Sequence, residues 1–349
     1  MADRSTESTD RFAEQWTLSI DQDAQAETDN FLVPTHVKES FAAHGYAVFP
    51  SVLSRSLVDE LNYHLEDVLR GRYDRGTKPD KTPKLLKNEY RPTRPEEEDD
   101  GSSKNDRKKI SFAAGPLGFS GNRQNVRVLQ VINVHKCDSA FRKLAESSIL
   151  GRVVAELAGW EPVGTRLAQD QVWAKPPGAP PLTFHRDSPY FMFDDPRVVT
   201  VWVALDDMDD PRLGPLQYVQ GSHKWGDERV GSANQFFDAD GGTDLLKSAA
   251  LRAGESDELV VESMLGLAAG GISIHDGRTW HGSGPNSCEN RPRRGLGLHF
   301  VPAKVKFTAE AAKSRLWRSY LEGQSVEPSE IDLPEDDFPI TWMPNTLTE

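Results

Sequence analysis

The chain has 349 residues, of which 37% are hydrophobic and 27% charged, an ordinary composition for a folded globular protein. Its 41 basic and 54 acidic residues give a formal net charge of −13, which argues against a general binder of nucleic acids or of anionic membranes. The two cysteines, Cys137 and Cys288, lie far apart and exclude a disulfide framework or a thiolate zinc site.

Targeting signals are not visible in the sequence. No apolar run approaches the ~20 residues that a helix needs to span a bilayer. The opening MADRSTESTDRF is acidic and polar, unlike a secretory leader, and the closing NTLTE is not a peroxisomal Ser-Lys-Leu address. We therefore expect a cytoplasmic protein without a membrane span, and no pattern in the sequence fixes its oligomeric state.

The N-terminal part begins with a polar stretch and continues as helices. Residues 1–30 are polar and charged, which predicts a disordered or loosely docked arm ahead of a single domain over residues 31–349. Val37, Phe41 and Ala42 recur at helical spacing, Gly45 ends this helix, and YAVF follows as a short strand. Residues 56–70 carry one apolar stripe and predict a second amphipathic helix.

A charged segment interrupts the domain at about residues 71–109. It is rich in Lys, Arg, Pro and Gly, contains an acidic block at 96–100, and has too little apolar surface to fold alone. We interpret it as a solvated insertion. The alternative is a lid whose lysines meet an anionic substrate, since long loops in compact domains are often functional.

Short strands dominate the rest of the chain. Residues 126–134 alternate as a strand does, a helix follows around residues 141–157 and ends near Gly159, and strand-like runs start at Arg166. These runs are LAQDQVWAKP, VVTVWVAL, LQYVQGS, GGISIH and RRGLGLHFVP, separated by turn clusters. The pattern predicts a mainly β fold, an antiparallel sandwich or barrel braced by α-helices. The aromatic, proline-rich tail at about 305–349 is expected to wrap around the outside.

A candidate metal site stands between two of these strands. His185 and Asp187 are two residues apart, so an extended strand would place an imidazole and a carboxylate on one face. His281, in TWHGSGPN, is the candidate third ligand. Two histidines and one carboxylate on one side of an octahedral metal leave positions for an oxoacid and O₂, as iron(II) oxygenases require. A His-X-Asp triplet alone is weak evidence, because such triplets also occur by chance.

The strand that contains Arg293 strengthens this interpretation. Arg293, Gly295, Gly297 and His299 share one face, and the glycines would keep that face open toward a ligand. A buried guanidinium at Arg293 needs a carboxylate partner, and its planar fork suits the far carboxylate of 2-oxoglutarate. Ser283 could add a hydroxyl donor. Arg294, on the apolar face of the same strand, is the competing candidate for this anchor. A further alternative is that Arg293 lies in solvent at the end of the strand and anchors nothing.

Polar residues alternate along two further strands, and they are open to two interpretations. Gln169, Gln171 and Trp173 share a face of the first strand, as Thr200 and Trp202 do of the second. These faces line either a wet pocket or the exposed side of a sheet. Directly after the ligand pair, an apolar group forms either a lip over the substrate or an ordinary core cluster: Tyr190, Phe191, Met192 and Phe193. We assign His223, His275 and His299 supporting or structural roles.

The motifs, taken together in their order, resemble the phytanoyl-CoA dioxygenase family. They are KPPG ahead of HRDSPYF, then TVWVALDD, LGPLQYVQGSHKWG, HGSGPN and RPRRGLGLHF, with FAAHGYAVFPSVLS near the N-terminus. The likeness covers about residues 37–302, apart from the charged insertion. It implies a double-stranded β-helix (jelly-roll, cupin-like) core that holds iron(II) and 2-oxoglutarate. LGPL, where many relatives have an Asn-Gly pair, is a departure that does not involve the metal ligands.

By that resemblance the site residues take specific roles. His185, Asp187 and His281 match the iron ligands, Arg293 and Ser283 match the anchors of 2-oxoglutarate, and Gln169, Gln171, Thr200 and Trp202 fall along the pocket of this co-substrate. The expected reaction uses O₂ to hydroxylate a small-molecule or lipid-like substrate, releasing succinate and CO₂. Asp187 disfavours halogenation, because related halogenases replace this carboxylate. Two alternatives remain open: a catalytically silent jelly-roll that only binds, and a metal-dependent dioxygenase or isomerase that does not use 2-oxoglutarate.

Overall fold

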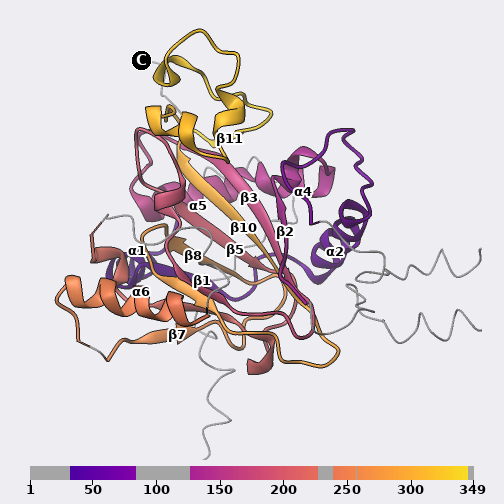
Figure 1. Cartoon of the computed structure of the whole chain (residues 1–349), viewed down its shortest axis with the longest axis vertical. Helices are drawn as coiled ribbons and strands as arrows, with labels where there is room; N and C mark the ends of the chain where they lie inside the picture. Colours follow the sequence, from indigo (N-terminus) through magenta and orange to yellow (C-terminus); the bar gives the residue numbers. More distant parts are fainter. Residues whose placement is uncertain (1–31, 84–125, 227–238, 257, 345–349) are drawn as a thin grey trace, which may run out of the picture.

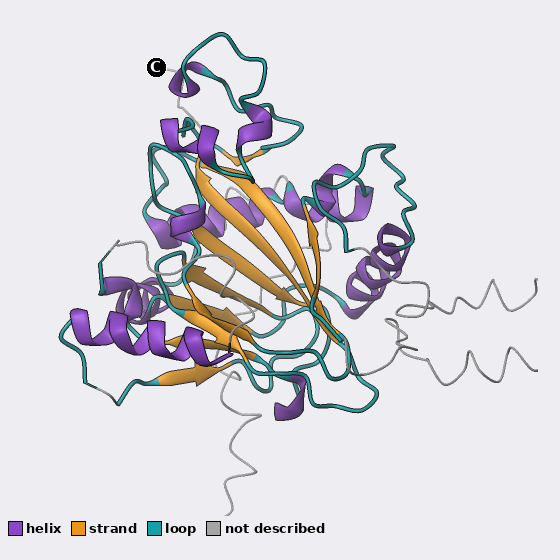
Figure 2. Cartoon of the chain, viewed as in Figure 1, coloured by secondary structure: helices purple, strands orange, loops and turns teal. Residues whose placement is uncertain are grey.

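The computed structural model describes residues 32–83, 126–226, 239–256 and 258–344. The predicted arm at residues 1–30 and most of the charged insertion lie outside the described residues. Strands fill the centre, and helices lie on one side and at both ends of them (Figures 1 and 2). None of the helices that the structure describes is both long and apolar enough to cross a membrane.

The first two helices lie where the sequence predicts them, whereas α6 (Ala239–Arg252) was not predicted and the third predicted helix is divided. Gly45 ends the first helix with a φ of 86°, a left-handed conformation that favours glycine. The single helix predicted around residues 141–157 is wrong: two helices meet at Glu146 and Ser147, because the Ser147 hydroxyl accepts from Leu150 N and starts a new helix. The α-helices are α1 (Thr35–His44), α2 (Arg55–Leu69), α4 (Ser139–Ala145), α5 (Ser148–Ala158) and α6 (Ala239–Arg252).

The strands form two antiparallel sheets within the described part of the chain. The larger sheet has the order β1-β8-β5-β10-β3-β11, with β2 paired to the other end of β3, and the smaller has the order β4-β9-β6-β7. The strand bounds are β1 (Tyr46–Phe49), β2 (Leu129–Ile132), β3 (Thr165–Lys175), β4 (Leu182–His185), β5 (Val199–Ala204), β6 (Leu216–Val219), β7 (Val261–Ser263), β8 (Ile272–Asp276), β9 (His281–Ser283), β10 (Arg293–Pro302) and β11 (Ile340–Trp342). This is the expected double-stranded β-helix, or jelly-roll.

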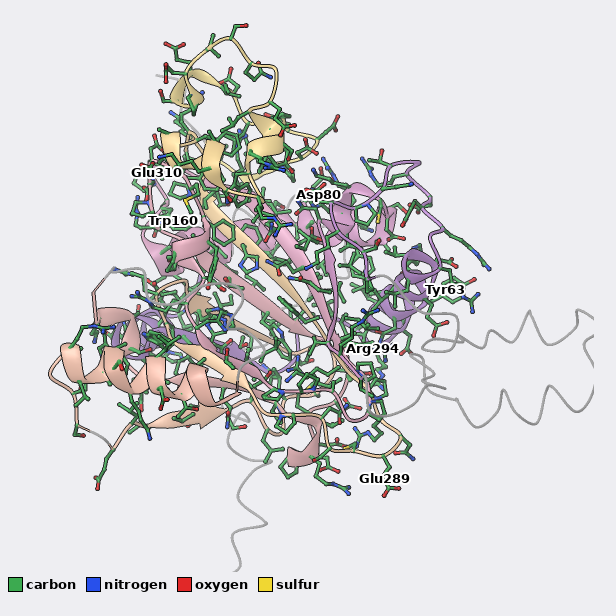
Figure 3. The ribbon with its side chains drawn as sticks, viewed as in Figure 1. Tyr63, Asp80, Trp160, Glu289, Arg294 and Glu310 are labelled. Carbon is green, nitrogen blue, oxygen red and sulfur yellow. The ribbon has the colours of Figure 1, made fainter. Side chains whose placement is uncertain are left out.

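Alternation along β10 separates the core from the interior of the jelly-roll. Leu296, Leu298 and Phe300 point to one side and join the main core with apolar residues of α1, α2, α4 and α5. The helices thus cover the outer face of the larger sheet, and side chains fill the space between them (Figure 3). On α2, Tyr63 faces outward and is 43% exposed, whereas Trp160, just after α5, is buried. The opposite face of β10 is left for the site.

The C-terminal tail packs at one end of the larger sheet (Figure 1). Its 3₁₀-helical turns, η10 (Ala309–Lys313), η11 (Arg318–Tyr320) and η12 (Pro328–Glu330), precede β11, which pairs with β3. A second core holds the tail in place and contains Phe193, Phe307, Trp317 and Phe338. The Trp317 indole also donates to Tyr190 O at 2.8 Å, which ties the tail to the segment after β4.

Candidate functional site

A cavity of about 1040 Å³ opens between the two sheets. Its wall is built from the inward faces of β3, β5, β8 and β10 on one side and from β4 and β9 on the other. Residues of the tail, Glu310 to Leu316, complete the rim. All the residues that the sequence suggested as metal ligands line this cavity.

His185, Asp187 and His281 meet on the wall of the cavity. His185 ends β4 and pairs in register with His281, which begins β9, and their ring centroids are 4.2 Å apart. Asp187 Oδ1 lies 3.8 Å from His185 Nε2 and 3.6 Å from His281 Nε2. One ligand atom from each residue falls within 4.8 Å of the others, so a single metal ion can reach all three.

Asp187 reaches this position by a turn and not from a strand. β4 ends at His185, and Asp187 has helical backbone angles, φ −82° and ψ −45°. The amides of Asp187 and Ser188 both donate to Gly277 O, at 2.8 and 2.9 Å, which holds the turn against the β8–β9 connection. The expectation that both side chains share a strand face is therefore wrong, although they converge on one point.

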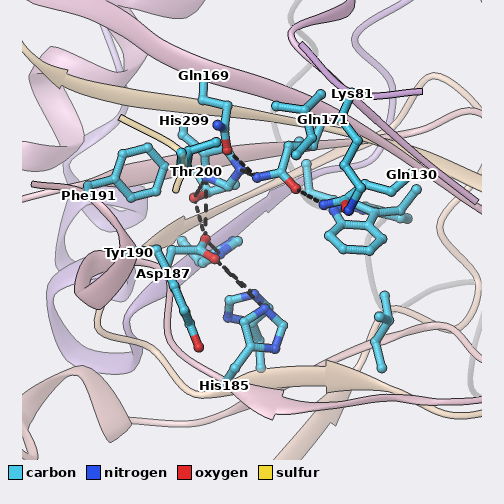
Figure 4. A pocket seen from close by; sticks show the side chains of 18 of the residues that line it. Lys81, Gln130, Gln169, Gln171, His185, Asp187, Tyr190, Phe191, Thr200 and His299 are labelled. Carbon is cyan, nitrogen blue, oxygen red and sulfur yellow. Dashed lines mark hydrogen bonds and ion pairs between the residues drawn. The ribbon is translucent and has the colours of Figure 1, made fainter. Parts of the chain in front are cut away.

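The second carboxylate oxygen of Asp187 is held by residues of the larger sheet. Thr200 Oγ1 donates to Asp187 Oδ2 at 2.6 Å, and His275 Nε2 lies 3.1 Å from the same oxygen. His299 Nδ1 is 2.9 Å from the Thr200 hydroxyl. Figure 4 shows Thr200 and His299 beside Asp187. With Oδ2 engaged, Oδ1 is the oxygen that faces His185 and His281. We call the three candidate ligands, together with Thr200, His275 and His299, the Asp187 corner.

The two ligand histidines are fixed in the tautomer that suits a metal. His185 Nδ1 lies 2.8 Å from Thr183 O, and His281 Nδ1 lies 3.0 Å from Thr279 O. A carbonyl only accepts hydrogen bonds, so each Nδ1 carries the proton and each Nε2 presents a lone pair toward Asp187 Oδ1.

Burial sets the charges of the three ligands. It lowers the pKa of His185 to about 3 and the pKa of His281 to about 4, so both imidazoles are neutral at pH 7. Burial acts to raise the pKa of Asp187, but the surrounding imidazoles, His281 first, hold this pKa well below its ordinary value. Two neutral imidazoles and one carboxylate suit a divalent first-row metal with open positions toward the cavity.

The opposite end of the wall holds two buried cations without a carboxylate. Arg293 is 1% exposed, donates to Gly214 O at 3.1 Å, and lies over the Trp202 ring at 5.8 Å. Lys175, its partner in the β3–β10 register, donates to Ser283 Oγ at 2.7 Å and Gly284 O at 2.5 Å. In the described ranges, no acidic side chain lies within ion-pair distance of either cation, and Arg293 Nε has no hydrogen-bond partner. We call Arg293, Lys175 and Ser283 the Arg293 corner.

Burial lowers the pKa of both cations in the Arg293 corner. The pKa of Arg293 falls to about 10, and burial, followed by the charge of Arg293, holds the pKa of Lys175 well below its usual range. Arg294, the competing candidate, instead points away from the cavity, where Asp206 Oδ2 accepts from its Nε at 2.9 Å. Arg293 is thus the arginine of this pair that an anion in the cavity would meet.

The other polar residues from the sequence also face the cavity and not solvent. Gln169, Gln171 and Trp173 of β3 and Thr200 and Trp202 of β5 all line it. Gly295 has no room for a side chain, because a Cβ there would lie 2.5 Å from the Trp202 ring. At Gly295, the space that the glycine leaves on this face of β10 is therefore filled by the Trp202 ring, which lies beside Arg293.

Of the four residues considered for the apolar lip, three line the cavity and the fourth packs in a core cluster. Tyr190, Phe191 and Met192 line the cavity, and the Phe191 ring lies 5.1 Å from that of His299. Phe193 turns the other way, with its ring 5.3 Å from Trp317 and 5.4 Å from Phe307. Phe193 belongs to the second core, which holds the tail. Its side chain points away from that of Met192, and its backbone forms a β-bridge with Phe307.

Sequence reasoning missed several residues at the site. Lys175 was not considered, although it continues the alternation of Gln169, Gln171 and Trp173 on β3. Tyr218 was also missed; its hydroxyl lies 3.1 Å from His275 Nδ1 and 2.7 Å from Ser273 Oγ. Lys81 lies in the described part of the charged insertion, where its backbone pairs with Ile132 and its side chain lines the cavity.

Comparisons with known proteins identify a family and agree with the fold. The family model for phytanoyl-CoA dioxygenase matches residues 41–295. The fold is similar to that of the non-haem, alpha-ketoglutarate-dependent carbocyclase SnoK from nogalamycin biosynthesis (TM-score 0.60, 18% identity, 89% of this chain and 97% of that one). It is also similar to the epimerase SnoN of the same biosynthesis (0.57, 18%, 90% and 99%) and to EctD from S. alaskensis (0.50, 16%, 88% and 85%). A search of curated proteins found no matching sequence.

Proposed function

The chain belongs to the phytanoyl-CoA dioxygenase family, and from this membership and the geometry of the cavity we propose that it hydroxylates a small organic substrate using iron(II), 2-oxoglutarate and O₂. The observation that carries the proposal is the meeting, in one cavity, of a three-atom metal site and a buried pair of cations that lack an anion. The Asp187 corner requires a metal cation, which iron(II) supplies, and the Arg293 corner requires an anion, which 2-oxoglutarate supplies.

The residues of the Asp187 corner fit a divalent iron ion. His185 Nε2, Asp187 Oδ1 and His281 Nε2 would hold it. These three atoms carry no proton at pH 7, so metal binding would not require a proton to be released. Thr200 and His275 keep Oδ2 occupied, so that Asp187 presents a single oxygen to the metal.

The residues of the Arg293 corner fit the far carboxylate of 2-oxoglutarate. Arg293 Nε is buried with no partner among the described residues, and a carboxylate would provide one. The Lys175 ammonium donates to Ser283 Oγ, which leaves the hydroxyl hydrogen of Ser283 to point elsewhere, toward the same carboxylate. Lys175 thereby serves as a positioning residue for Ser283.

When bound, iron(II) and 2-oxoglutarate would activate O₂, with one oxygen atom going to succinate as 2-oxoglutarate loses CO₂ and the other going to a substrate C–H bond. The chain's own contribution is to orient these groups and to keep water from them. Phe191, Trp202 and Leu216 make the inner wall apolar around the polar corners. Asp187 occupies the ligand position that a halide would need, so hydroxylation is proposed rather than halogenation.

The test uses the full chain with iron(II) and 2-oxoglutarate under anaerobic conditions. A weak visible charge-transfer band should appear, and admitting O₂ should then release succinate slowly even without substrate. His185→Ala should abolish both, whereas the exposed His36→Ala serves as the matched control and should leave both intact. No band and no succinate from the unchanged protein would overturn the proposal. Metal binding without any effect of 2-oxoglutarate would favour the alternative of an enzyme that does not use this co-substrate.

A further inference from the structure

A row of hydrogen-bonded side chains runs along the cavity wall from its rim inward (Figure 4). Lys81 Nζ donates to Gln130 Oε1 at 2.6 Å, and Gln130 Nε2 donates to Gln171 Oε1 at 2.7 Å. Gln171 Nε2 then donates to Gln169 Oε1. All four residues line the cavity, and the row links the described end of the insertion to β2 and β3.

Lys81 sets the direction of every bond in this row. An ammonium group can only donate, so Gln130 must turn its oxygen toward Lys81 and its nitrogen onward. Because each amide has one oxygen and one nitrogen, the same orientation is imposed on Gln171 and then on Gln169. The oxygen of Gln169 is therefore taken, and its nitrogen is the free donor at the inner end of the row.

That last donor has no acceptor in the described part of the chain. Gln169 is 1% exposed, and its Nε2 atom is buried without a hydrogen-bond partner. Buried donors in native proteins are almost always paired, because an unpaired one loses its hydrogen bonds to water and gains nothing in return. The missing acceptor is expected to belong to a ligand that enters the cavity.

The position of Gln169 distinguishes that ligand from 2-oxoglutarate. In the β3–β10 register Gln169 pairs with His299, whereas Lys175 pairs with Arg293. Six residues on a strand span roughly 20 Å, which is longer than a five-carbon diacid. With one carboxylate in the Arg293 corner and the other end at the metal, 2-oxoglutarate would end near Asp187 and Thr200. Gln169 lies level with these residues but on the other side of His299, one strand further across the sheet.

We propose that Gln169 Nε2 donates to an oxygen atom of the primary substrate, and that the substrate is oxygenated where it enters this part of the cavity. A carbonyl, carboxyl or hydroxyl oxygen satisfies the donor, whereas a bare hydrocarbon chain leaves it buried and unpaired. The proposal rests on the proposed function, because it assigns the Arg293 corner to 2-oxoglutarate. It moves Gln169 from the co-substrate pocket, where the sequence placed it, to the substrate.

The test compares two probes of nearly the same shape. 1-Tetralone carries a carbonyl, and 1-methylenetetralin carries a C=CH₂ group in its place. Each is titrated into the anaerobic protein loaded with iron(II) and 2-oxoglutarate, and the shift of the charge-transfer band reports binding. The unchanged protein should bind the ketone about tenfold more tightly than the hydrocarbon.

Variants at the two ends of the row make the test specific. Gln169→Leu should bind both probes equally while keeping the band, which shows that the variant folds and binds 2-oxoglutarate normally. Lys81→Met, at the exposed rim, should reduce the preference for the ketone about threefold, because the amides are then free to reverse. Lys81→Arg, which also can only donate, is the matched control and should retain the preference.

Three results would overturn the inference. These are no discrimination by the unchanged protein (including binding of neither probe up to the solubility limit of the ketone), a preference that survives Gln169→Leu, and loss of the band in Gln169→Leu. The last would place Gln169 at 2-oxoglutarate after all. If the unchanged protein gives no band, the proposed function fails instead. Probe binding is then still measurable by tryptophan fluorescence, because Trp173 and Trp202 line the same cavity.

Discussion

The Asp187 corner and the Arg293 corner share one cavity but differ in how their polar atoms are satisfied. In the Asp187 corner, Oδ2 of the carboxylate and Nδ1 of each ligand histidine have partners within the chain, and only the three atoms that face one another are left. In the Arg293 corner, Arg293 donates to a carbonyl and Lys175 donates to a hydroxyl and to other carbonyls, and no carboxylate of the described residues pairs with either cation.

We call the Asp187 corner finished, because the chain supplies partners for all its polar atoms except those that face the metal position. We call the Arg293 corner unfinished, because the described residues supply no anion for its cations. The Asp187 corner needs only a cation to be complete, and its geometry is held by the fold. A buried, unneutralised charge is unfavourable, so the Arg293 corner is a place where the fold gives up stability until an anion arrives. The predictions below test this contrast, beginning with the largest expected effect.

Removing a ligand from the finished corner should have the largest effect. His185→Ala leaves the metal with two protein ligands, and we expect its affinity for iron(II) to fall by more than about 100-fold, with loss of succinate formation. Equilibrium dialysis against iron(II) measures the change. His36→Ala, on the exposed side of α1, is the control. Unchanged metal binding in His185→Ala would mean that the metal site lies elsewhere.

The unfinished corner should respond to the loss of a cation by losing its anion, not its metal. Arg293→Ala should weaken 2-oxoglutarate binding by about 2 kcal/mol or more, roughly 30-fold, while iron(II) affinity stays the same. Arg294→Ala is the matched control: it breaks the pair with Asp206 and should lower the free energy of unfolding by about 3 kcal/mol without affecting 2-oxoglutarate. Titration of the charge-transfer band and urea unfolding distinguish them. The reverse pattern would show that Arg294 is the anchor.

A milder change tests how firmly the chain holds the Asp187 carboxylate. Thr200→Val keeps the side-chain shape but removes the hydroxyl that donates to Asp187 Oδ2. We expect iron(II) affinity to fall by about tenfold, with no change in the affinity of the iron-loaded protein for 2-oxoglutarate. Thr183→Val is a suitable comparison, because it also removes a threonine hydroxyl near the ligands but keeps the backbone oxygen that lies 2.8 Å from His185 Nδ1. Equal losses in both variants would contradict a specific role for the Thr200 hydroxyl.

The smallest effect concerns the stability of the metal-free protein in mild acid. The pKa values of His185 and His281, about 3 and about 4, lie below the ordinary 6.5, so the unfolded chain takes up protons first as the pH falls. Stability should therefore decrease below pH 6.5, by about 1 kcal/mol for each histidine at pH 6. Urea unfolding at pH 7.5 and pH 6 measures this. His185→Ala should remove only the share of this dependence that His185 contributes and should leave the share of His281.

Much of the fold could be predicted because it depends on local alternation. β3, β5 and β10 were recognisable from side chains of period two, and the same alternation placed Arg293 and the glutamines on an inner face. Lys175 was within reach of this reasoning, since it is the next residue of the inner face of β3. The family motifs added the order in which these elements meet.

The remainder depends on contacts between distant parts of the chain. Asp187 leaves the strand because two amides bind Gly277 O, about ninety residues later, and no local pattern contains that bond. Phe193 leaves the cavity because the tail provides Phe307 and Trp317 for it to pack against. The roles of His275 and Tyr218 likewise appear only once β8 and β6 lie near Asp187.

The tail contributes a wall of the cavity but no residue of either corner. Glu310, Lys313 and Leu316 line the rim, held by Trp317 and by the pairing of β11 with β3. The residues of this rim and the three candidate metal ligands are thus encoded in separate stretches of the gene. Substitutions at the exposed positions Glu310 and Lys313 should therefore change the shape and charge of the rim while leaving the metal-ligand set unchanged.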